Sequence, residues 1–256
     1  MERSTLYEFP LNEKMRNFMR LENCFTQIDH FASRNSIWDS QATLMVLLEI
    51  LNIIEKHDIK NEVTKELERN IVILTNLSDV PDIDNHKLQQ TLDQLHTQLQ
   101  TIQNINGKIV RALREEDLLN VIRQRTSIGS SINSFEIPSF YYWINKPEQF
   151  RQQQLNSWLT EIMPIASAIR LLLNLIRDSA TFDTKTATTG FFQKTLSAQQ
   201  FCQIVRIELS SNVNYFPEAS GNKHRISVRF LTYANPNQRP VQITDDVDFV
   251  MSCCGI

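Results

Sequence analysis

The sequence predicts an α+β protein: a predominantly helical bundle domain and a small antiparallel β-sheet domain. Up to about Asp183, apolar residues recur with the helical period of about 3.6 residues. Beyond that residue the period changes to about two, because apolar and polar residues alternate through Val205–Leu209. We therefore expect a helical domain at residues 11–183, and a β-strand domain that combines residues 1–10 with residues 186–256.

The N-terminal stretch is expected to join the two domains. Thr5–Phe9 alternates like a short strand, which Pro10 ends because proline has no N–H to donate to a sheet. An isolated strand would leave its amides without partners, so this strand is expected to add to the C-terminal sheet. Asn12 can then cap the first helix, on which Arg16 and Arg20 lie four residues apart on one face.

Three further helical segments follow with different characters. The segment from Trp38 to about His57 has a wide apolar face and is predicted to be a central core helix. Asp58–Asn76 is amphipathic, with charged residues on its outer side. The segment from Asp84 to about Ile105 carries a narrow heptad stripe of leucine and isoleucine among glutamines. That stripe fits either a hairpin with the preceding helix or a dimer seam.

The longest helix is expected from Glu148 to Ser179, and Pro164 should kink or divide it because proline cannot donate its hydrogen bond. The threonine-rich stretch Thr184–Thr189 is interpreted as a linker to the β-strand domain. Loops are expected at residues 78–82, 106–107, 126–135 and 235–237.

The composition excludes several classes of function. The 26 lysines and arginines are balanced by 29 acidic residues, giving a net charge of −3. A general nucleic-acid binder usually carries a clear basic excess, so we expect no nucleic-acid partner. The chain has only 5 glycines. It contains neither G-x-G-x-x-G nor G-x-x-x-x-G-K-[ST], the two glycine-rich motifs that bind phosphate groups. Neither a cofactor nor an enzymatic activity is expected.

Targeting, membrane and metal signals are also missing from the sequence. The first residues contain no apolar leader segment, and charged or polar residues interrupt the longest apolar stretches. We therefore expect a cytoplasmic protein without a membrane partner. The four cysteines form no C-x-x-C pair and are interpreted as reduced thiols. The five histidines are scattered, so no metal site is expected.

A local basic excess is the main candidate for a binding surface. Arg225, Ser227 and Arg229 are each two residues apart, so they project from the same face of a predicted strand, with Lys223 just before it. If the N-terminal strand joins this sheet, Lys14, Arg16 and Arg20 lie nearby. We hypothesise that these six basic residues, which are Lys14, Arg16, Arg20, Lys223, Arg225 and Arg229, line one groove for an acidic peptide.

Plainer interpretations remain open for some of these residues. Arg16 and Arg20 also fit the solvated edge of an ordinary amphipathic helix. Arg123 and Arg125 fall in the last turn of a predicted helix, where cations favour the helix dipole, and they are equally possible contacts for a partner. Ser139, His224 and Asp245 could be drawn as a catalytic triad, but the sequence around the serine lacks a nucleophile-elbow motif.

Five stretches in order along the chain resemble the ZapD family of bacterial cell-division proteins. They are FPLNEKMRNFMRLE at residues 9–22, LREEDLLNVIRQR at 113–125, LNLIRDSA at 173–180, GNKHRISVRF at 221–230 and DFVMSCC at 248–254. The resemblance implies a non-enzymatic, dimeric, cytoplasmic protein at the midcell division site. It implies binding to the C-terminal tail of the tubulin-like protein FtsZ and the bundling of FtsZ filaments into the Z-ring.

The resemblance also bears on the site residues. The basic surface of the family is thought to meet the FtsZ tail, which supports the six basic residues proposed above. One difference is Glu116-Asp117, where relatives can carry a basic residue, so that helix start is not expected to be a contact. The homodimer is an inference, because bundling requires two partner sites and the chain shows no internal repeat. The alternative is a generic dimeric helical scaffold that binds another acidic partner.

Overall fold

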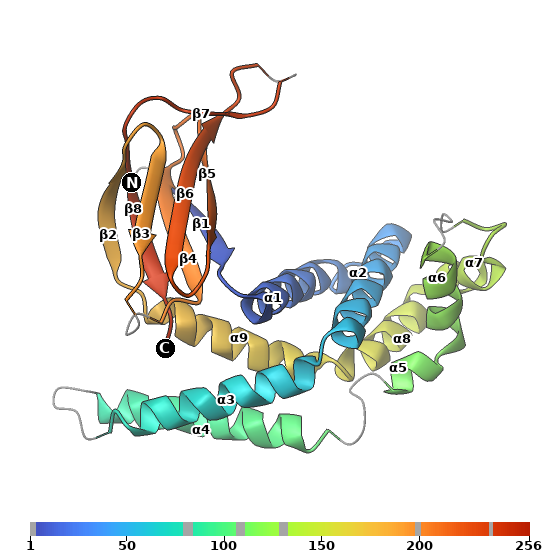
Figure 1. Ribbon diagram of the computed structural model, residues 1–256. Helices are drawn as coiled ribbons and strands as arrows, with labels where there is room; N and C mark the ends of the chain where they lie inside the picture. Colours follow the sequence, from blue (N-terminus) through green and yellow to red (C-terminus); the bar gives the residue numbers. More distant parts are fainter. Residues whose placement is uncertain (1–3, 79–83, 106–110, 128–132, 198–200, 236–237) are drawn as a thin grey trace. The chain divides into compact units, whose positions relative to one another are not determined.

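The computed structural model describes residues 4–78, 84–105, 111–127, 133–197, 201–235 and 238–256. Within these residues the chain forms helices and antiparallel sheets, so the α+β prediction is confirmed (Figure 1). The chain divides into a strand unit, residues 1–19 with 173–256, and a helical unit, residues 20–172. The domain boundaries expected from the sequence, 11–183 and 1–10 with 186–256, stay a prediction. Of the loops expected at 78–82, 106–107, 126–135 and 235–237, residues 79–82, 106–107, 128–132 and 236–237 lie outside the described residues. The loop expected from Thr126 begins too early, because helix α6 continues to Ser127.

The helices of the described chain follow one another with short connections. Helices α1 and α9 contribute residues to both units, and the other helices belong to the helical unit. Their bounds are α1 (Glu13–Ala32), α2 (Ile37–Lys56), α3 (Ile59–Thr75), α4 (Asn85–Gln103), α5 (Arg111–Glu115), α6 (Asp117–Ser127), α7 (Pro138–Ile144), α8 (Glu148–Thr160) and α9 (Met163–Asp178).

Helix α2 is the central core helix that its wide apolar face predicted. It begins with a capping box, in which the Ser36 hydroxyl accepts from the Asp39 amide at 3.0 Å and the Asp39 carboxylate accepts from the Ser36 amide at 3.3 Å. By length and composition α2 could cross a membrane, but half of that apolar window is buried inside the structure. Helices α7 and α8 pack against α2, as expected for a core helix.

Helices α3 and α4 form an antiparallel hairpin within the chain (Figure 1). The heptad residues Leu88, Leu92, Leu95 and Ile102 are buried in this hairpin. The Lys60 ammonium of α3 donates to the carbonyl oxygen of Ile105, just after α4, at 2.8 Å. Of the two roles that the sequence left open for this stripe, the hairpin is the one that the structure shows.

The predicted long helix is divided, as Pro164 led us to expect. Helix α8 ends at Thr160, helix α9 begins at Met163, and the two axes are bent by 58°. Pro164 lies at the second position of α9, where the missing N–H would have no helical partner in any case. The proline thus starts a helix instead of interrupting one.

The strand unit contains two antiparallel sheets (Figure 1). The first has the strand order β1-β4-β8-β2, and the second has the order β3-β6-β5, with β7 also paired to β6. The bounds are β1 (Ser4–Pro10), β2 (Phe182–Ala187), β3 (Phe191–Thr195), β4 (Ile204–Ser210), β5 (Phe216–Gly221), β6 (Arg225–Thr232), β7 (Val241–Gln242) and β8 (Val247–Cys254).

Strand β1 is the predicted N-terminal addition to the C-terminal sheet. It pairs antiparallel with β4 over its whole length, from Ser4 opposite Ser210 to Pro10 opposite Ile204. Its place at the sheet edge tolerates the proline, because only one side of the strand needs ladder hydrogen bonds. The prediction that this strand joins the sheet is therefore confirmed.

The core of the strand unit is built from alternate residues of both sheets. Val205, Ile207 and Leu209 from β4 lie in one buried cluster with Phe230 from β6 and Phe249 from β8. The rings of Phe230 and Phe249 are 4.9 Å apart. The residues that alternate with these buried ones along each strand therefore face outward. The polar side chains of β6 accordingly lie on the outer face of the second sheet.

The linker interpretation of Thr184–Thr189 is wrong for its first four residues, because β2 runs from Phe182 to Ala187. Threonine is β-branched and favours strands, and the Thr186 hydroxyl donates to Asp248 of β8 at 2.6 Å. The strands also divide between two sheets, whereas one small sheet was expected. Alternation along single strands could not reveal that division, since it depends on which strands pair.

An ion-pair cluster lies on the outer face of the first sheet. The Glu8 carboxylate on β1 accepts from Arg177 Nε and Nη2 at 2.9 and 2.8 Å. Arg206 Nε of β4 lies 3.1 Å from the same carboxylate, and each of the three side chains is less than one-fifth exposed. This cluster fastens the end of α9 to the sheet.

Candidate functional site

The outer face of β6 carries the basic row that the sequence predicted. Arg225 and Arg229 are exposed and Ser227 between them is half-buried, while Ile226 and Val228 face the core. Within the described residues neither arginine makes an ion pair. The two guanidinium groups are therefore held in solvent, where they can pair with carboxylates bidentately.

The neighbouring strands complete this face with one acidic and one aromatic residue. Arg229 lies opposite Glu218 on β5 and opposite Phe191 on β3. Glu218 reduces the positive charge at this end of the row, whereas Arg225 has Thr195 opposite it on β3. Phe191 is 40% exposed, so an apolar contact is available beside the arginine.

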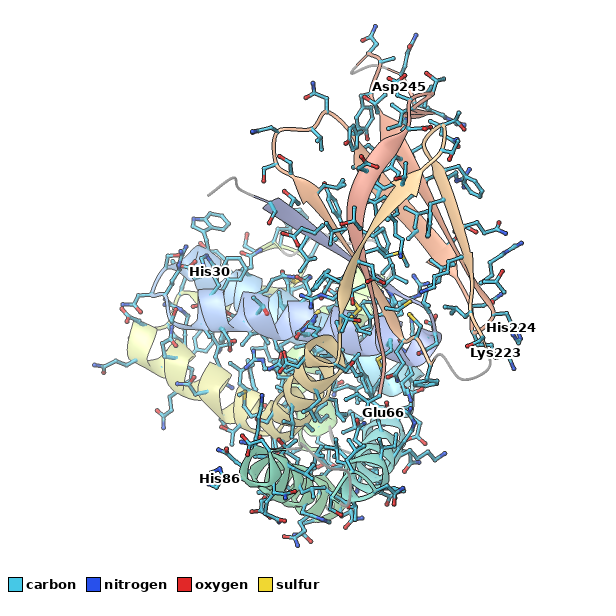
Figure 2. All side chains as sticks on the ribbon, turned by 90° about the vertical axis from the view of Figure 1, so that its left-hand side faces the viewer. His30, Glu66, His86, Lys223, His224 and Asp245 are labelled. Carbon is cyan, nitrogen blue, oxygen red and sulfur yellow. The ribbon has the colours of Figure 1, made fainter. Side chains whose placement is uncertain are left out.

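The turn between β5 and β6 is closed by Asn222. Its side-chain oxygen accepts from the His224 amide at 2.8 Å and from the Arg225 amide at 3.2 Å. Lys223 is exposed at this turn, at the end of the sheets opposite Asp245 (Figure 2). The turn therefore presents Lys223 and Arg225 together at one end of the strand unit.

Gly221 brings this turn against Leu11, which lies between β1 and α1. A Cβ atom at Gly221 would lie 3.0 Å from Leu11 Cδ2 and 2.7 Å from the Arg225 carbonyl oxygen. Only glycine fits such a close approach without a shift of the neighbours. The contact places the first turn of α1 at the same end of the strand unit as the basic turn.

The first turn of α1 carries the other predicted basic residues of the strand unit. The Asn12 side chain accepts from the Met15 amide at 2.9 Å, which confirms the predicted cap. Arg16 is exposed and lies 3.3 Å from the Glu13 carboxylate, one turn earlier. Lys14 is half-buried on the same turn. Exposed pairs of this type are weak, so Arg16 can exchange Glu13 for another carboxylate.

The remaining predicted residues belong to the helical unit. Arg20 is exposed one turn after Arg16 on α1. Arg123 donates to the carboxylate of Glu55 on α2 and to the Asn120 side chain at 3.2 Å. Arg125 is exposed in the last turn of α6. For Arg123 and Arg125 the helix-stabilising and binding roles both stay predictions.

Catalytic and metal-binding alternatives find no support in the described residues. His224 and Asp245 lie at opposite ends of the sheets (Figure 2), so the triad that could be drawn from the sequence has no histidine–carboxylate pair. Among the residues described, no group of three or more His, Cys, Asp or Glu side chains could hold a metal ion.

Sequence reasoning missed the two residues that flank Arg229. The position of Phe191 beside Arg229 depends on the register between β3 and β6. Only the pairing of β5 with β6 sets Glu218 opposite an arginine. Alternation within one strand carries no signal about register across strands.

Comparison with known proteins assigns the chain to a family. A family model described as "ZapD: Cell division protein" matches residues 19–229. The chain belongs to the ZapD family of cell division proteins. This membership confirms the resemblance seen in the sequence and the expectation that the protein is not an enzyme.

Relatives of this family match over nearly their whole length. "Cell division protein ZapD" of Methylococcus capsulatus is 39% identical over 254 residues, which are 99% of each chain. The protein of the same name from Coxiella burnetii is 33% identical over 251 residues, covering 98% of this chain and 97% of the relative. The one from Nitrosomonas europaea is 31% identical over 250 residues, covering 98% and 95%.

Proposed function

We propose that the protein binds the C-terminal tail of FtsZ, and that a homodimer cross-links FtsZ filaments and promotes assembly of the Z-ring at midcell. Membership of a family of cell division proteins supports this role at the division site, in the cytoplasm. The observation that carries the proposal is the exposed row of Arg225 and Arg229 on the outer face of β6.

The binding surface of this proposal lies in the strand unit. It comprises Lys223, Arg225 and Arg229 on the β5–β6 hairpin and Lys14 and Arg16 on the first turn of α1. The packing of Gly221 against Leu11 supports their grouping, because it places both segments at one end of the unit. Arg20, on the next turn of α1, remains a separately predicted contact.

The chemistry of the surface indicates the kind of segment that it binds. The cations outnumber the two carboxylates described beside them, Glu218 opposite Arg229 and Glu13 next to Arg16. Phe191 adds an apolar contact beside Arg229. An extended peptide with acidic residues and an apolar side chain would satisfy both features. Because the cations are exposed, steering of the peptide should depend on ionic strength, with a screening length of about 8 Å at physiological salt.

Cross-linking requires a second binding site in the same particle. One strand unit offers one such row of arginines, so a homodimer is the simplest bivalent arrangement. Bivalency raises the effective concentration of the second tail without any new contact. Analytical ultracentrifugation of the protein alone will test this step, and a monomer at the concentration that bundles filaments would refute it.

Co-sedimentation with polymerised FtsZ tests the binding proposal directly. Wild-type protein should pellet with full-length FtsZ and stay in the supernatant with tail-deleted FtsZ. The Arg225→Glu/Arg229→Glu variant should bind at least about 10-fold more weakly, because each reversal replaces an attraction by a repulsion. Wild-type pelleting by this variant would refute the assignment of the surface.

A matched variant controls for the change in net charge. Arg34→Glu/Arg239→Glu reverses two other exposed arginines and changes the net charge by the same amount. It should pellet with full-length FtsZ like the wild type. Equal loss of binding in both variants would mean that net charge alone controls binding. No pelleting of the wild type with full-length FtsZ would favour the alternative, a dimeric scaffold with another acidic partner.

A further inference from the structure

Two cysteines from distant parts of the sequence meet at one end of the strand unit. Cys202 lies just before β4 and Cys253 lies in β8, and the Gln203 amide donates to the Cys254 carbonyl oxygen at 2.8 Å beside them. The Cys202 thiol donates to Cys253 Sγ across 2.7 Å. That separation exceeds the covalent S–S bond length by only about 0.7 Å. Both cysteines are free thiols.

A pocket gives a small reagent access to this pair. The cavity measures about 410 Å³, and its lining includes Cys202, Cys253, Lys185 and Lys194. Cys253 is partly exposed there, whereas Cys202 is 8% exposed. The outer thiol is therefore the one that a reagent entering the pocket meets first.

The surroundings give the two thiols different acidities. The hydrogen bond from Cys202 lowers the pKa of the Cys253 thiol, and Lys194 lowers it further by its charge. The same hydrogen bond, together with burial, raises the pKa of Cys202. The thiolate is the reactive form of cysteine, so Cys253 has the character of a nucleophile and Cys202 that of a proton donor.

We propose that Cys202 and Cys253 form a peroxide-responsive site, which a small hydroperoxide converts into a reversible intrachain disulfide. An accessible thiolate beside a second cysteine is the arrangement that redox-sensing proteins use. The site shares no residue with the basic surface, and its oxidation can be measured without FtsZ, so the proposal does not depend on the proposed binding of FtsZ.

The reaction proceeds in two steps whose atoms and electrons balance. The Cys253 thiolate attacks the O–O bond of the hydroperoxide, which gives a sulfenic acid and, after protonation, an alcohol or water. The Cys202 sulfur then attacks the Cys253 sulfur, so that the S–S bond forms, the S–O bond breaks and water leaves. The two thiols lose two hydrogens and two electrons in total, and the peroxide is reduced. A thiol reductant reverses the change.

The disulfide would close a long loop within the strand unit. The loop from Cys202 to Cys253 contains β4 to β8, and the Gln203 carbonyl next to Cys202 also accepts from the Leu11 amide at 2.9 Å. Cross-linking a loop of this length restricts the unfolded chain strongly. We expect oxidation to raise the melting temperature by about 5–10 °C, and dithiothreitol to return it to its original value.

Peptide mapping of the full-length protein tests the proposal. After hydrogen peroxide treatment and alkylation of free thiols, trypsin should release the peptide 195–206 joined to the peptide 230–256. The second peptide contains both Cys253 and Cys254, so fragmentation spectra must identify the linked residue. A link at Cys254, a link between Cys253 and Cys254, or no link at all would each overturn the proposal.

Serine variants separate the roles of the two thiols. In Cys202→Ser the reaction should stop at the sulfenic acid, which dimedone will label at Cys253. Cys253→Ser should give neither the label nor the linked peptide, and Cys254→Ser should still form the disulfide. Circular dichroism under reducing conditions will verify the fold of each variant. Dimedone labelling at Cys202 in place of Cys253 would refute the assigned roles. The peptide map of the oxidised wild-type protein tests the disulfide itself and needs no variant to fold.

Discussion

Replacing Glu8 by glutamine should weaken the strand unit more than any change of a surface carboxylate. Glu8 accepts two hydrogen bonds from Arg177 and lies 3.1 Å from Arg206. Glutamine keeps the volume of the side chain but removes its charge, so two guanidinium groups are left beside each other without an anion. Each of these groups is less than one-fifth exposed, and solvent can therefore compensate for only part of the loss.

The size of the effect follows from this geometry. Removing one member of a fully buried ion pair costs about 3–5 kcal/mol, and a hydrogen bond to a charged group contributes about 1.5–3 kcal/mol. Because the cluster retains some exposure, we expect a loss of about 2–4 kcal/mol in the free energy of unfolding. Urea denaturation followed by circular dichroism will measure it as a lower midpoint with an unchanged slope.

Glu208→Gln provides the matched control on the neighbouring strand β4. Within the described residues Glu208 makes no ion pair, so its loss should cost no more than about 0.5 kcal/mol. A double-mutant cycle of Glu8→Gln with Arg177→Met should show a coupling energy above about 1 kcal/mol. Equal effects of the two glutamine variants, or no coupling, would refute the view that this cluster fastens α9 to the sheet.

Three further substitutions and one measurement on the unchanged protein test other features of the two units. Gly221→Ala should lower stability by about 1–3 kcal/mol, seen as a lower melting temperature, because its methyl group would press on a backbone oxygen and on Leu11. Asn12→Ala should cost about 1 kcal/mol in urea denaturation by removing the cap of α1, and an unchanged midpoint would contradict this role. Glu55→Gln should cost about 1 kcal/mol in the same assay, since it releases the arginines of α5 and α6 that pair with it. Burial raises the pKa of Cys24 from 9.0 to about 11, so little of the thiol is ionised below that pH. Alkylation of Cys24 should be slow at pH 8 and accelerate up to about pH 11. Alkylation at the rate of a cysteine in the denatured chain would refute the burial argument.

Much of the fold could be predicted because single elements carry their own periodic signals. The alternation of Thr5–Phe9 and the cap at Asn12 identified β1 and the start of α1. Pro164 marked the division between α8 and α9, because proline acts on the backbone wherever it occurs. The linker at Thr184–Thr189 was misinterpreted, since the strand β2 there is polar and mostly exposed.

The candidate site was predictable only along one strand. The two-residue spacing placed Arg225 and Arg229 on one face, and the structure shows them there. The neighbours of Arg229 could not be predicted from the sequence, because Glu218 and Phe191 lie opposite it through the registers of two different strand pairs. The same holds for Cys202 and Cys253, which 50 intervening residues separate in the sequence.

The pairing of β1 with β4 has a consequence for synthesis of the chain. Residues at the very start of the chain need partners near position 205, as in the pairing of Ser4 with Ser210. Ribosomes add about 5–20 residues per second, so the first strand waits about 10–40 s for its partner to be made. The helical unit, which is continuous from Arg20 to Leu172, is complete before that partner leaves the ribosome. Until β4 is made, the amides of β1 that pair with it are exposed, so this strand needs protection during translation.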